Sequence, residues 1–599
     1  MAGDKTVRIG GASGFWGDSS VGAPQLVAHG ELDYLVFDYL AELTMSILAA
    51  ARAKDPDAGY ATDFVHVTLR AVLRDALAHG IRIVSNAGGV NPQACAHAIA
   101  ALAAELGVEV RVAVVTGDDV MPMLPALRGE GVRPFDVGTM LPARVLTANA
   151  YLGALSVKAA LDAGAQIVVT GRCVDSAVTL GVLMHEFGWG ADDHDLLAQG
   201  SLAGHIIECG CQATGGLHTD WESVPDWPHI GYPVIECDSD GSFVVTKPSG
   251  TGGLVNAAVV AEQVLYEIGD PQRYLLPDVT CDFSEVRLEE IDVHRVQVTG
   301  ARGRAPGPDY KVSATYVDGF RCTAQLTIIG IDAARKAQRT GEAILVRTRE
   351  LFAAQGLADY TRTNIEVLGS ERAYFGAGAA TPHVREVVLR VAVMHPQKAA
   401  LELFAREIAP AGTSWSPGTT GADGRPKPSP CIRQFAFLLG KGRLQAKVTL
   451  GDAELAVDVP CDQQPVPPAQ RPVFAEPPSS PAQQALVEVP LVRVAWARSG
   501  DKGDTSNIGV IARRPEWLPW LRTQLTPQLV AQWLGHLVVG SVTRYDLPGL
   551  AAMNFVCTQA LDGGGMASLR NDPLGKGMAQ VLLTVPVRVP ATWVADSAA

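Results

Sequence analysis

The residues best suited to acid–base chemistry follow short apolar runs in the first part of the chain. Arg172 and Asp175 lie three positions apart in the segment GRCVDSA, and Asp38 follows the apolar run Tyr34–Phe37. A carboxyl group can transfer a proton, and a guanidinium can hold a carboxylate or thioester oxygen. The same spacing fits a structural role, in which Asp175 caps a helix and Arg172 pairs with it. The sequence leaves both roles open.

A second group of reactive side chains occupies the segment GHIIECGCQATGG. His205, Glu208, Cys209 and Cys211 fall within it. Glu208 or Cys209 could act as a base or nucleophile if a neighbour shifts its pKa. The alternative is that the cysteines are small buried residues. Because no second pair of ligands at zinc-binding spacing occurs, we expect no metal.

Three glycine-rich turns could hold an anionic ligand: Gly10–Gly17, Asn86–Asn91 and Ser249–Gly253. Glycine lets the backbone approach a ligand, and a helix N-terminus offers free N–H groups. The predicted ligand-binding residues are Gly11, Ser13, Gly14, Asp18, Asn86, Gly88, Gly89, Asn91, Lys247, Ser249, Gly250 and Gly252. No turn carries an ATP or dinucleotide fingerprint, so we expect no tightly bound cofactor and CoA only as part of the substrate. Ordinary turns between strands and helices are the alternative.

The elements that must position these residues alternate between strand and helix. Strands are predicted at Val7–Gly10, Tyr34–Phe37, Ile81–Val84, Val110–Val115 and Gln166–Val169. Helices are predicted at Phe64–His79, Pro92–Leu106, Ala148–Ala163 and Asp175–Phe187. Alternation of this kind predicts an α/β fold with a parallel sheet, and we favour an open, doubly wound sheet over a barrel. Ligands bind such sheets at the carboxyl ends of the strands, where Asp18, Asp38, Glu42, Asn86, Asn91, Arg172, Asp175 and Ser176 would lie.

The middle of the chain predicts an α+β region. Strands are expected at Gly231–Cys237, Ser242–Thr246, His294–Val298, Tyr310–Val317, Gly319–Ile328, Phe435–Leu439 and Arg443–Asp458. Helices are expected at Leu254–Ile268, Ile331–Leu351 and Gln397–Ile408. The segment Pro460–Pro481 then contains eight prolines, a density that favours an extended spacer. We therefore expect a body over residues 1–458, a linker over 459–487 and a second domain over 488–590.

The second domain predicts a small βαββαβ sandwich. Its strands are expected at Val489–Ala497, Ser541–Tyr545, Leu550–Thr558 and Ala579–Val587, with a helix at Trp517–Leu534. The segment SGDKGD, with Asp501, Lys502 and Asp504, follows the first strand as a charged loop. It could bind a ligand or dock the domain on the body, and docking is favoured, because loop residues of this kind are usually solvated.

Composition excludes several classes of protein. The chain has 599 residues and a formal net charge of −14, with no basic patch, so nucleic acid is not an expected partner. Its apolar runs break on charges before reaching the length of a membrane span. The opening residues carry no apolar signal region, and ten scattered cysteines lack framework spacing. We expect a cytoplasmic protein without membrane contact.

Six segments, in order, resemble the acyclic terpene utilisation AtuA family: RIGGASGFWGDS, DYLVFDYLAELTM, SNAGGVNP, GRCVDSA, GHIIECGCQATGG and GRPKPSP. The segments RSGDKGDTSNIGVIAR and LPGLAAMNFVCTQALDGGG resemble the ferredoxin-fold domain associated with that family. The resemblance implies bacterial catabolism of branched, acyclic terpenoids through acyl-CoA intermediates, near a biotin-dependent acyl-CoA carboxylase. It does not define the reaction.

Two functions remain from these observations. The first is an enzyme, a hydro-lyase or carbon–carbon lyase, that acts on a branched acyl-CoA or branched acid. Carboxylates with an arginine would suffice for such acid–base chemistry. The second is a non-catalytic binding or assembly component of the carboxylase pathway. A biotin carrier is not supported, because the chain has no Met-Lys-Met tripeptide. In either case we expect a homo-oligomer.

Overall fold

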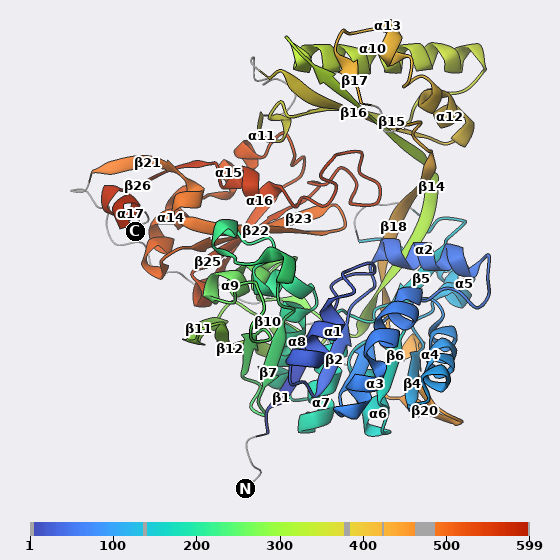
Figure 1. Ribbon diagram of the computed structural model, residues 1–599, viewed down its shortest axis with the longest axis vertical. Coiled ribbons are helices and arrows are strands. Elements are labelled where there is room, and N and C mark those ends of the chain that lie inside the picture. The colour runs from blue at the N-terminus through green and yellow to red at the C-terminus, as the bar shows by residue number, and fades with distance from the viewer. Residues whose placement is uncertain (1–4, 136–139, 376–383, 422–423, 462–484, 597–599) are drawn as a thin grey trace.

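The computed structural model describes residues 5–135, 140–375, 384–421, 424–461 and 485–596. Figure 1 shows three parts: a large α/β body, a lobe at the far end of the long strand β14, and a C-terminal domain beside both. Most of the predicted proline-rich linker lies outside the described residues, so the domain limits stay predictions.

An open mixed sheet forms the centre of the body. Its strand order is β11-β12-β8-β7-β1-β2-β3-β6-β4-β19-β20. The parallel strands are β1 (Val7–Gly11), β2 (Tyr34–Phe37), β3 (Arg82–Ser85), β6 (Ile167–Thr170) and β4 (Val112–Thr116). Antiparallel pairing adds β7 (Val234–Cys237), β8 (Phe243–Thr246), β12 (Arg295–Thr299) and β11 (Arg287–Asp292) at one side. At the other side it adds β19 (Ala446–Leu450) and β20 (Ala453–Val457).

Helices cover both faces of this sheet, which confirms the predicted α/β body. In β2, Leu35 and Phe37 pack into one core while Tyr34 and Val36 pack into the other, because successive side chains point to opposite faces. The first core is closed by α1 (Gly22–His29), α2 (Glu42–Arg52), α3 (Arg70–Ala78) and α4 (Pro92–Leu106). The second is closed by α5 (Leu124–Gly129), α6 (Leu155–Asp162), α7 (Ala177–Phe187), α8 (His194–Ile207) and α9 (Ala257–Leu265).

Several predicted elements of the body differ from the structure, among them the predicted strand Arg443–Asp458, which is the antiparallel pair β19 and β20. The predicted helix Ala148–Ala163 is wrong at its start, where β5 (Thr147–Ala150) pairs antiparallel with β14 (Asp309–Ile329) and α6 follows. Alanine is compatible with both helix and strand, so the pairing with β14 determines that this segment forms a strand. The two strands predicted on either side of Asp318 are one strand, β14, with a register shift between Val317 and Phe320.

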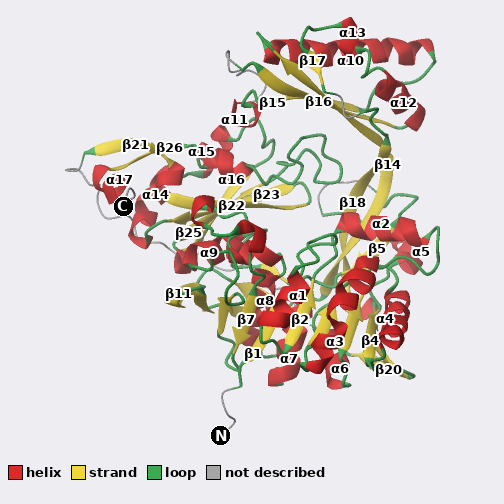
Figure 2. Ribbon diagram, viewed as in Figure 1, coloured by secondary structure: helices red, strands yellow, loops and turns green. Residues whose placement is uncertain are grey.

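The lobe is built on the second half of β14 (Figure 2). Its strands are β15 (Arg362–Leu368), β16 (Glu386–His395) and β17 (Thr419–Thr420), and β18 (Ser429–Gly440) returns along β14 to the body. Its helices are α10 (Ala333–Ala354), α11 (Arg372–Phe375), α12 (Lys398–Arg406) and α13 (Ala411–Ser414). Small strands of the body are β9 (Tyr274–Leu275), β10 (Thr280–Asp282) and β13 (Arg302–Arg304).

The C-terminal domain has the predicted α+β class. Its antiparallel sheet has the order β22-β23-β25-β24, from β22 (Ala495–Lys502), β23 (Thr505–Ala512), β24 (Val542–Leu547) and β25 (Ala552–Cys557). The helices are α14 (Leu518–Gln524), α15 (Pro527–Trp533), α16 (Met578–Leu582) and α17 (Ala591–Asp596), and β21 (Leu486–Pro490) pairs with β26 (Pro586–Pro590).

The order of strands in this domain differs from the predicted βαββαβ. SGDKGD is not a loop but the end of the β22–β23 hairpin, in which Lys502 pairs with Thr505. Gly503, between them, has φ of 62°, a backbone conformation that suits a two-residue hairpin turn. The strand β23 therefore follows directly where a charged loop was predicted, because a two-residue turn between strands has the same polar composition as a longer loop.

The C-terminal domain contacts both other parts. On the lobe, Arg362 donates to the carbonyl of Ala567 at 3.1 Å, and Asn364 donates to the carbonyl of Leu569 at 3.1 Å. On the body, Arg513 forms two hydrogen bonds of 2.6 Å to Asp220. These contacts hold the domain against the chain that precedes it.

Candidate functional site

Charged residues from distant parts of the chain meet near the carboxyl ends of the parallel strands. We call the following set the charged cluster: Asp38, Glu42, Tyr151, Arg172, Asp175, Glu208 and Lys311. Asp38 follows β2 and Arg172 follows β6, as predicted. Asn86, after β3, donates from its amide to Asp38 and accepts from the backbone N–H of Tyr39 at 2.8 Å. The predicted convergence at this sheet edge is therefore present.

Arg172 is bonded within the chain. Its Nη1 donates to Asp175 Oδ1 at 2.7 Å and to the carbonyl of Cys173 at 2.8 Å, and its guanidinium lies 4.1 Å from the centre of the Tyr151 ring. Burial by itself would lower the pKa of Arg172, but Asp175 and other negative charges raise it well above its usual value. Only 4% of the residue is exposed. Arg172 therefore holds other cluster residues in place, and little of its own side chain is accessible to a ligand.

Of the two structural roles expected for Asp175, pairing with Arg172 and capping a helix, the structure shows the first. It pairs with Arg172, but the N-cap of α7 is Ser176 and no side chain caps that end. The capping alternative is wrong. Asp175 keeps 27% of its side chain exposed, so a ligand can reach the carboxylate that Arg172 orients.

The carboxyl groups of the cluster fall into two kinds. Burial, together with the negative charge of Asp175, raises the pKa of Asp38 well above its usual range. Burial also raises the pKa of Glu208, although His205, whose Nδ1 lies 3.0 Å from Glu208 Oε1, opposes it. Glu42 is the opposite case: burial opposes ionisation, but Lys311 and Arg172 lower its pKa to about 2. Neighbouring carboxyl groups whose pKa values are shifted in opposite directions are a pattern that acid–base catalysis uses.

Lys311 is a cluster residue that was not predicted from the sequence. It lies on β14, where its Nζ is 3.8 Å from Glu42 Oε1 and 4.6 Å from the centre of the Tyr151 ring. Tyr151 also escaped prediction; its hydroxyl donates to Glu42 at 2.5 Å. Burial lowers the pKa of Lys311, and the nearby positive charges of Lys502 and Arg172 lower it further. A lysine on a long strand has no local sequence signal that would mark it as functional.

The cysteine segment does not have the features of a nucleophile. Burial raises the pKa of Cys209 well above its usual value, and burial raises the pKa of Cys211 to about 12. A thiolate is disfavoured at both positions. Within the described ranges, no three His, Cys, Asp or Glu side chains are grouped so that they could hold a metal ion. Glu208 is the member of this segment that faces the cluster.

The first two glycine turns pack closely against the protein itself. A side chain at Gly14 would come within 2.8 Å of the backbone of Cys209, and one at Gly88 within 2.5 Å of the Thr170 carbonyl. Their polar residues are also engaged by the chain. Asn91 caps α4 by accepting from Ala94, and Asp18 accepts from the backbone N–H of Gly14 at 2.9 Å. These turns bring the strand ends together, and the structure explains the glycines without a ligand.

The third turn is also engaged by the chain itself. Lys247 donates to the Thr251 carbonyl at 2.7 Å within the same turn. A side chain at Gly252 would come within 2.1 Å of the Asp226 carbonyl, and Gly250 has φ of 76°. Among the described residues, no hydrogen bond or ion pair joins Lys247, Ser249, Gly250 or Gly252 to the charged cluster. The predicted meeting of this turn with the other two therefore stays a prediction.

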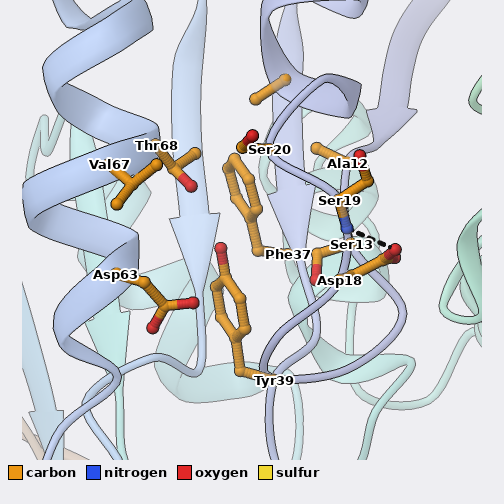
Figure 3. Close-up of a pocket in the computed structure, with 11 residues that line it drawn as sticks. Ala12, Ser13, Asp18, Ser19, Ser20, Phe37, Tyr39, Asp63, Val67 and Thr68 are labelled. Carbon is orange, nitrogen blue, oxygen red and sulfur yellow. Dashed lines mark hydrogen bonds between the residues drawn. The ribbon is translucent and has the colours of Figure 1, made fainter.

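A small pocket opens beside the first turn (Figure 3). It measures about 160 Å³ and is lined by Ser13, Asp18, Tyr39, Asp63 and neighbouring residues. Figure 3 shows the Asp18 carboxylate bonded to the backbone N–H of Ser19, and that bond measures 2.7 Å. Sites for drug-sized ligands span roughly 300–1,000 Å³, so this pocket fits only a small group.

The fold and the cluster together define the class: a doubly wound α/β protein with ionisable residues at the strand ends and an appended α+β domain. The chain belongs to the acyclic terpene utilisation family AtuA, whose model matches residues 7–450. Residues 489–588 match the AtuA ferredoxin-like domain. Searches of curated proteins and of solved structures found no significant match. No helix in the described part of the chain is long and apolar enough to span a membrane.

Proposed function

We propose that this protein is an enzyme of acyclic terpenoid or branched-acid catabolism that performs lyase chemistry on a branched acyl-CoA. Family membership supports the pathway. The observation that carries the chemistry is a single cluster in which the pKa of Asp38 is raised, the pKa of Glu42 is lowered and Asp175 pairs with Arg172. We further propose a cytoplasmic homo-oligomer that holds CoA only as part of its substrate.

For a hydro-lyase reaction we assign the role of base to Asp175 and the role of acid to Asp38. Asp175, held by Arg172, removes the proton next to the thioester carbonyl. The electron pair released forms a carbon–carbon double bond, and Asp38 donates its proton to the departing hydroxyl, which leaves as water. A matched acid and base of this kind contribute about 10²- to 10⁴-fold each to the rate. Cys209 has no role in this proposal, because its thiol stays protonated.

The test is incubation of the purified protein with a panel of branched acyl-CoAs in H₂¹⁸O, followed by mass spectrometry. Incorporation of ¹⁸O, or loss of water from a hydroxyacyl-CoA, would support hydro-lyase chemistry, and a shorter acyl chain would indicate carbon–carbon cleavage. Both activities should be lost in Asp38→Asn. Co-purification with a biotin-dependent carboxylase without turnover of any thioester would favour the alternative, a non-catalytic component of that pathway.

A further inference from the structure

The tip of the β22–β23 hairpin reaches the charged cluster from the C-terminal domain. Figure 1 shows this hairpin extending from its own domain toward β18 and α2. A side chain at Gly503, in the turn, would lie 4.0 Å from Gln434 Oε1 on β18. The amide of Gln434 in turn donates to Glu42 of the cluster at 3.1 Å. The hairpin tip is thus one residue removed from the cluster.

Lys502 is the charged residue at that tip. Its Nζ lies 2.7 Å from Glu267 Oε2 of the body, and 52% of its side chain remains exposed. The negative charge of Asp175 acts on the Lys502 ammonium, and the positive charge of Lys502 acts in turn on Glu208. Lys502 therefore lies at the charged cluster as well as at Glu267. An exposed ammonium beside catalytic carboxylates can bind a ligand oxygen.

The docking of the hairpin is specific enough to place Lys502. Gly500 and Gly509 lie where a side chain would come within 2.7 Å of the Glu267 backbone and 2.5 Å of Leu265. Asn507 donates to the Leu265 carbonyl at 2.8 Å. These contacts seat the hairpin on the end of α9 through groups other than the Lys502 side chain. Lys502 adds its ion pair with Glu267, and the exposed part of its side chain leaves the ammonium accessible to a ligand as well.

We propose that Lys502 completes the candidate site, so that the C-terminal domain supplies a substrate-binding residue as well as a docking surface. It would bind an oxygen of the acyl-CoA, either the thioester oxygen or a phosphate oxygen, on the side of the cluster where Lys311 lies. This ligand rests on the proposed function, whereas the position of Lys502 does not. The proposal goes beyond the docking role expected for SGDKGD.

Binding of 3-methylcrotonyl-CoA and of free CoA to the full chain tests the ligand. Lys502→Met should weaken binding by about 10- to 100-fold, the loss of one charge-assisted hydrogen bond, and Lys502→Arg should restore part of it. A loss confined to the thioester would identify the acyl oxygen, and an equal loss with free CoA would identify a phosphate. The matched control is Arg513→Met, which removes an ion pair between the same two domains away from the cluster and should leave binding unchanged. Equal binding by wild type and Lys502→Met would overturn the inference while leaving the proposed function intact.

A second readout does not need the substrate. The pH at which Lys311 reacts with an amine-labelling reagent reports its charge, and Glu42, Asp175, Arg172 and Lys502 all face it. Lys502→Met removes a neighbouring positive charge, so the midpoint of Lys311 labelling should move to higher pH, whereas Arg513→Met should not move it. If wild type binds no acyl-CoA, the proposed function fails and this midpoint alone decides whether Lys502 lies at the cluster. An unchanged midpoint would overturn the inference.

Discussion

At the residue scale, the raised pKa of Asp38 predicts an unusual effect of substitution. Below the usual aspartate pKa of 3.8, the group is protonated in both folded and unfolded chains. As the pH rises, the unfolded chain ionises first, because burial and Asp175 raise the pKa of Asp38 in the folded protein. Stability is therefore lost between pH 4 and the folded pKa, by about 1.4 kcal/mol for each unit of difference.

Asp38→Asn should remove that loss. We expect the variant to be as stable as wild type near pH 4 and more stable than wild type at pH 7, with turnover lowered by about 10²- to 10⁴-fold. Urea unfolding at several pH values and the acyl-CoA assay measure the two effects. A variant that is fully active, or less stable than wild type throughout this range, would show that Asp38 is ionised and structural.

Arg172 should be essential for stability, in contrast to the ligand clamp that the sequence suggested. Arg172→Met would leave Asp175 and Glu42 beside a neutral side chain, and breaking a buried ion pair costs about 3–5 kcal/mol. Urea unfolding at pH 7 should show this loss. The control is Arg302→Met on the exposed pair with Asp195, for which we expect a change below about 1 kcal/mol. If Arg172→Met instead weakens ligand binding without any loss of stability, Arg172 acts as the ligand clamp.

At the element scale, the end of α9 is held by two asparagines of the C-terminal sheet. Asn554 donates to the carbonyls of Ile268 and Gly269 at 2.7 Å, and Asn507 donates to Leu265. A helix leaves its last carbonyls unpaired, so side chains from another domain can satisfy the backbone there. The docking surface is thus built from backbone groups of the body and side chains of the C-terminal domain.

Asn554→Leu should therefore weaken docking. We expect about 1–3 kcal/mol for each carbonyl left unsatisfied, measured as a lower first transition in calorimetry. Asn571→Leu, at an exposed position of the same domain, serves as the matched control. If both variants unfold alike, the asparagine contacts do not hold the domains together.

At the scale of the whole molecule, the C-terminal domain should stay bound after the chain is cut. Proline-rich segments between domains are preferred cleavage sites, so limited proteolysis should cut within residues 460–484. The contacts Arg513–Asp220 and Arg362–Ala567 join the pieces on two sides. We expect the fragments to co-elute in size-exclusion chromatography. Separate elution at moderate salt would show that the interface depends on the covalent link, and cleavage elsewhere first would contradict the predicted boundary.

The sequence by itself determined the elements whose signals are local. The apolar run Tyr34–Phe37 and the alanine-rich segment Pro92–Leu106 have the predicted bounds, because burial and helix-start signals lie within each segment. It also placed Asp38, Arg172 and Asp175 at one edge, since the carboxyl ends of parallel strands share an edge. The α/β class and part of the candidate site could therefore be predicted from the sequence.

Only the tertiary structure decided which residues complete the cluster and how each is charged. Lys311 reaches Glu42 from β14, and Lys502 approaches through a hairpin in place of the predicted loop. A lysine has the same local pattern on a solvated strand and beside a buried carboxylate. The pKa of Asp38 likewise depends on burial and on Asp175, which is distant in sequence. Contacts between distant segments and desolvation are properties of the packed chain, and no local pattern records them.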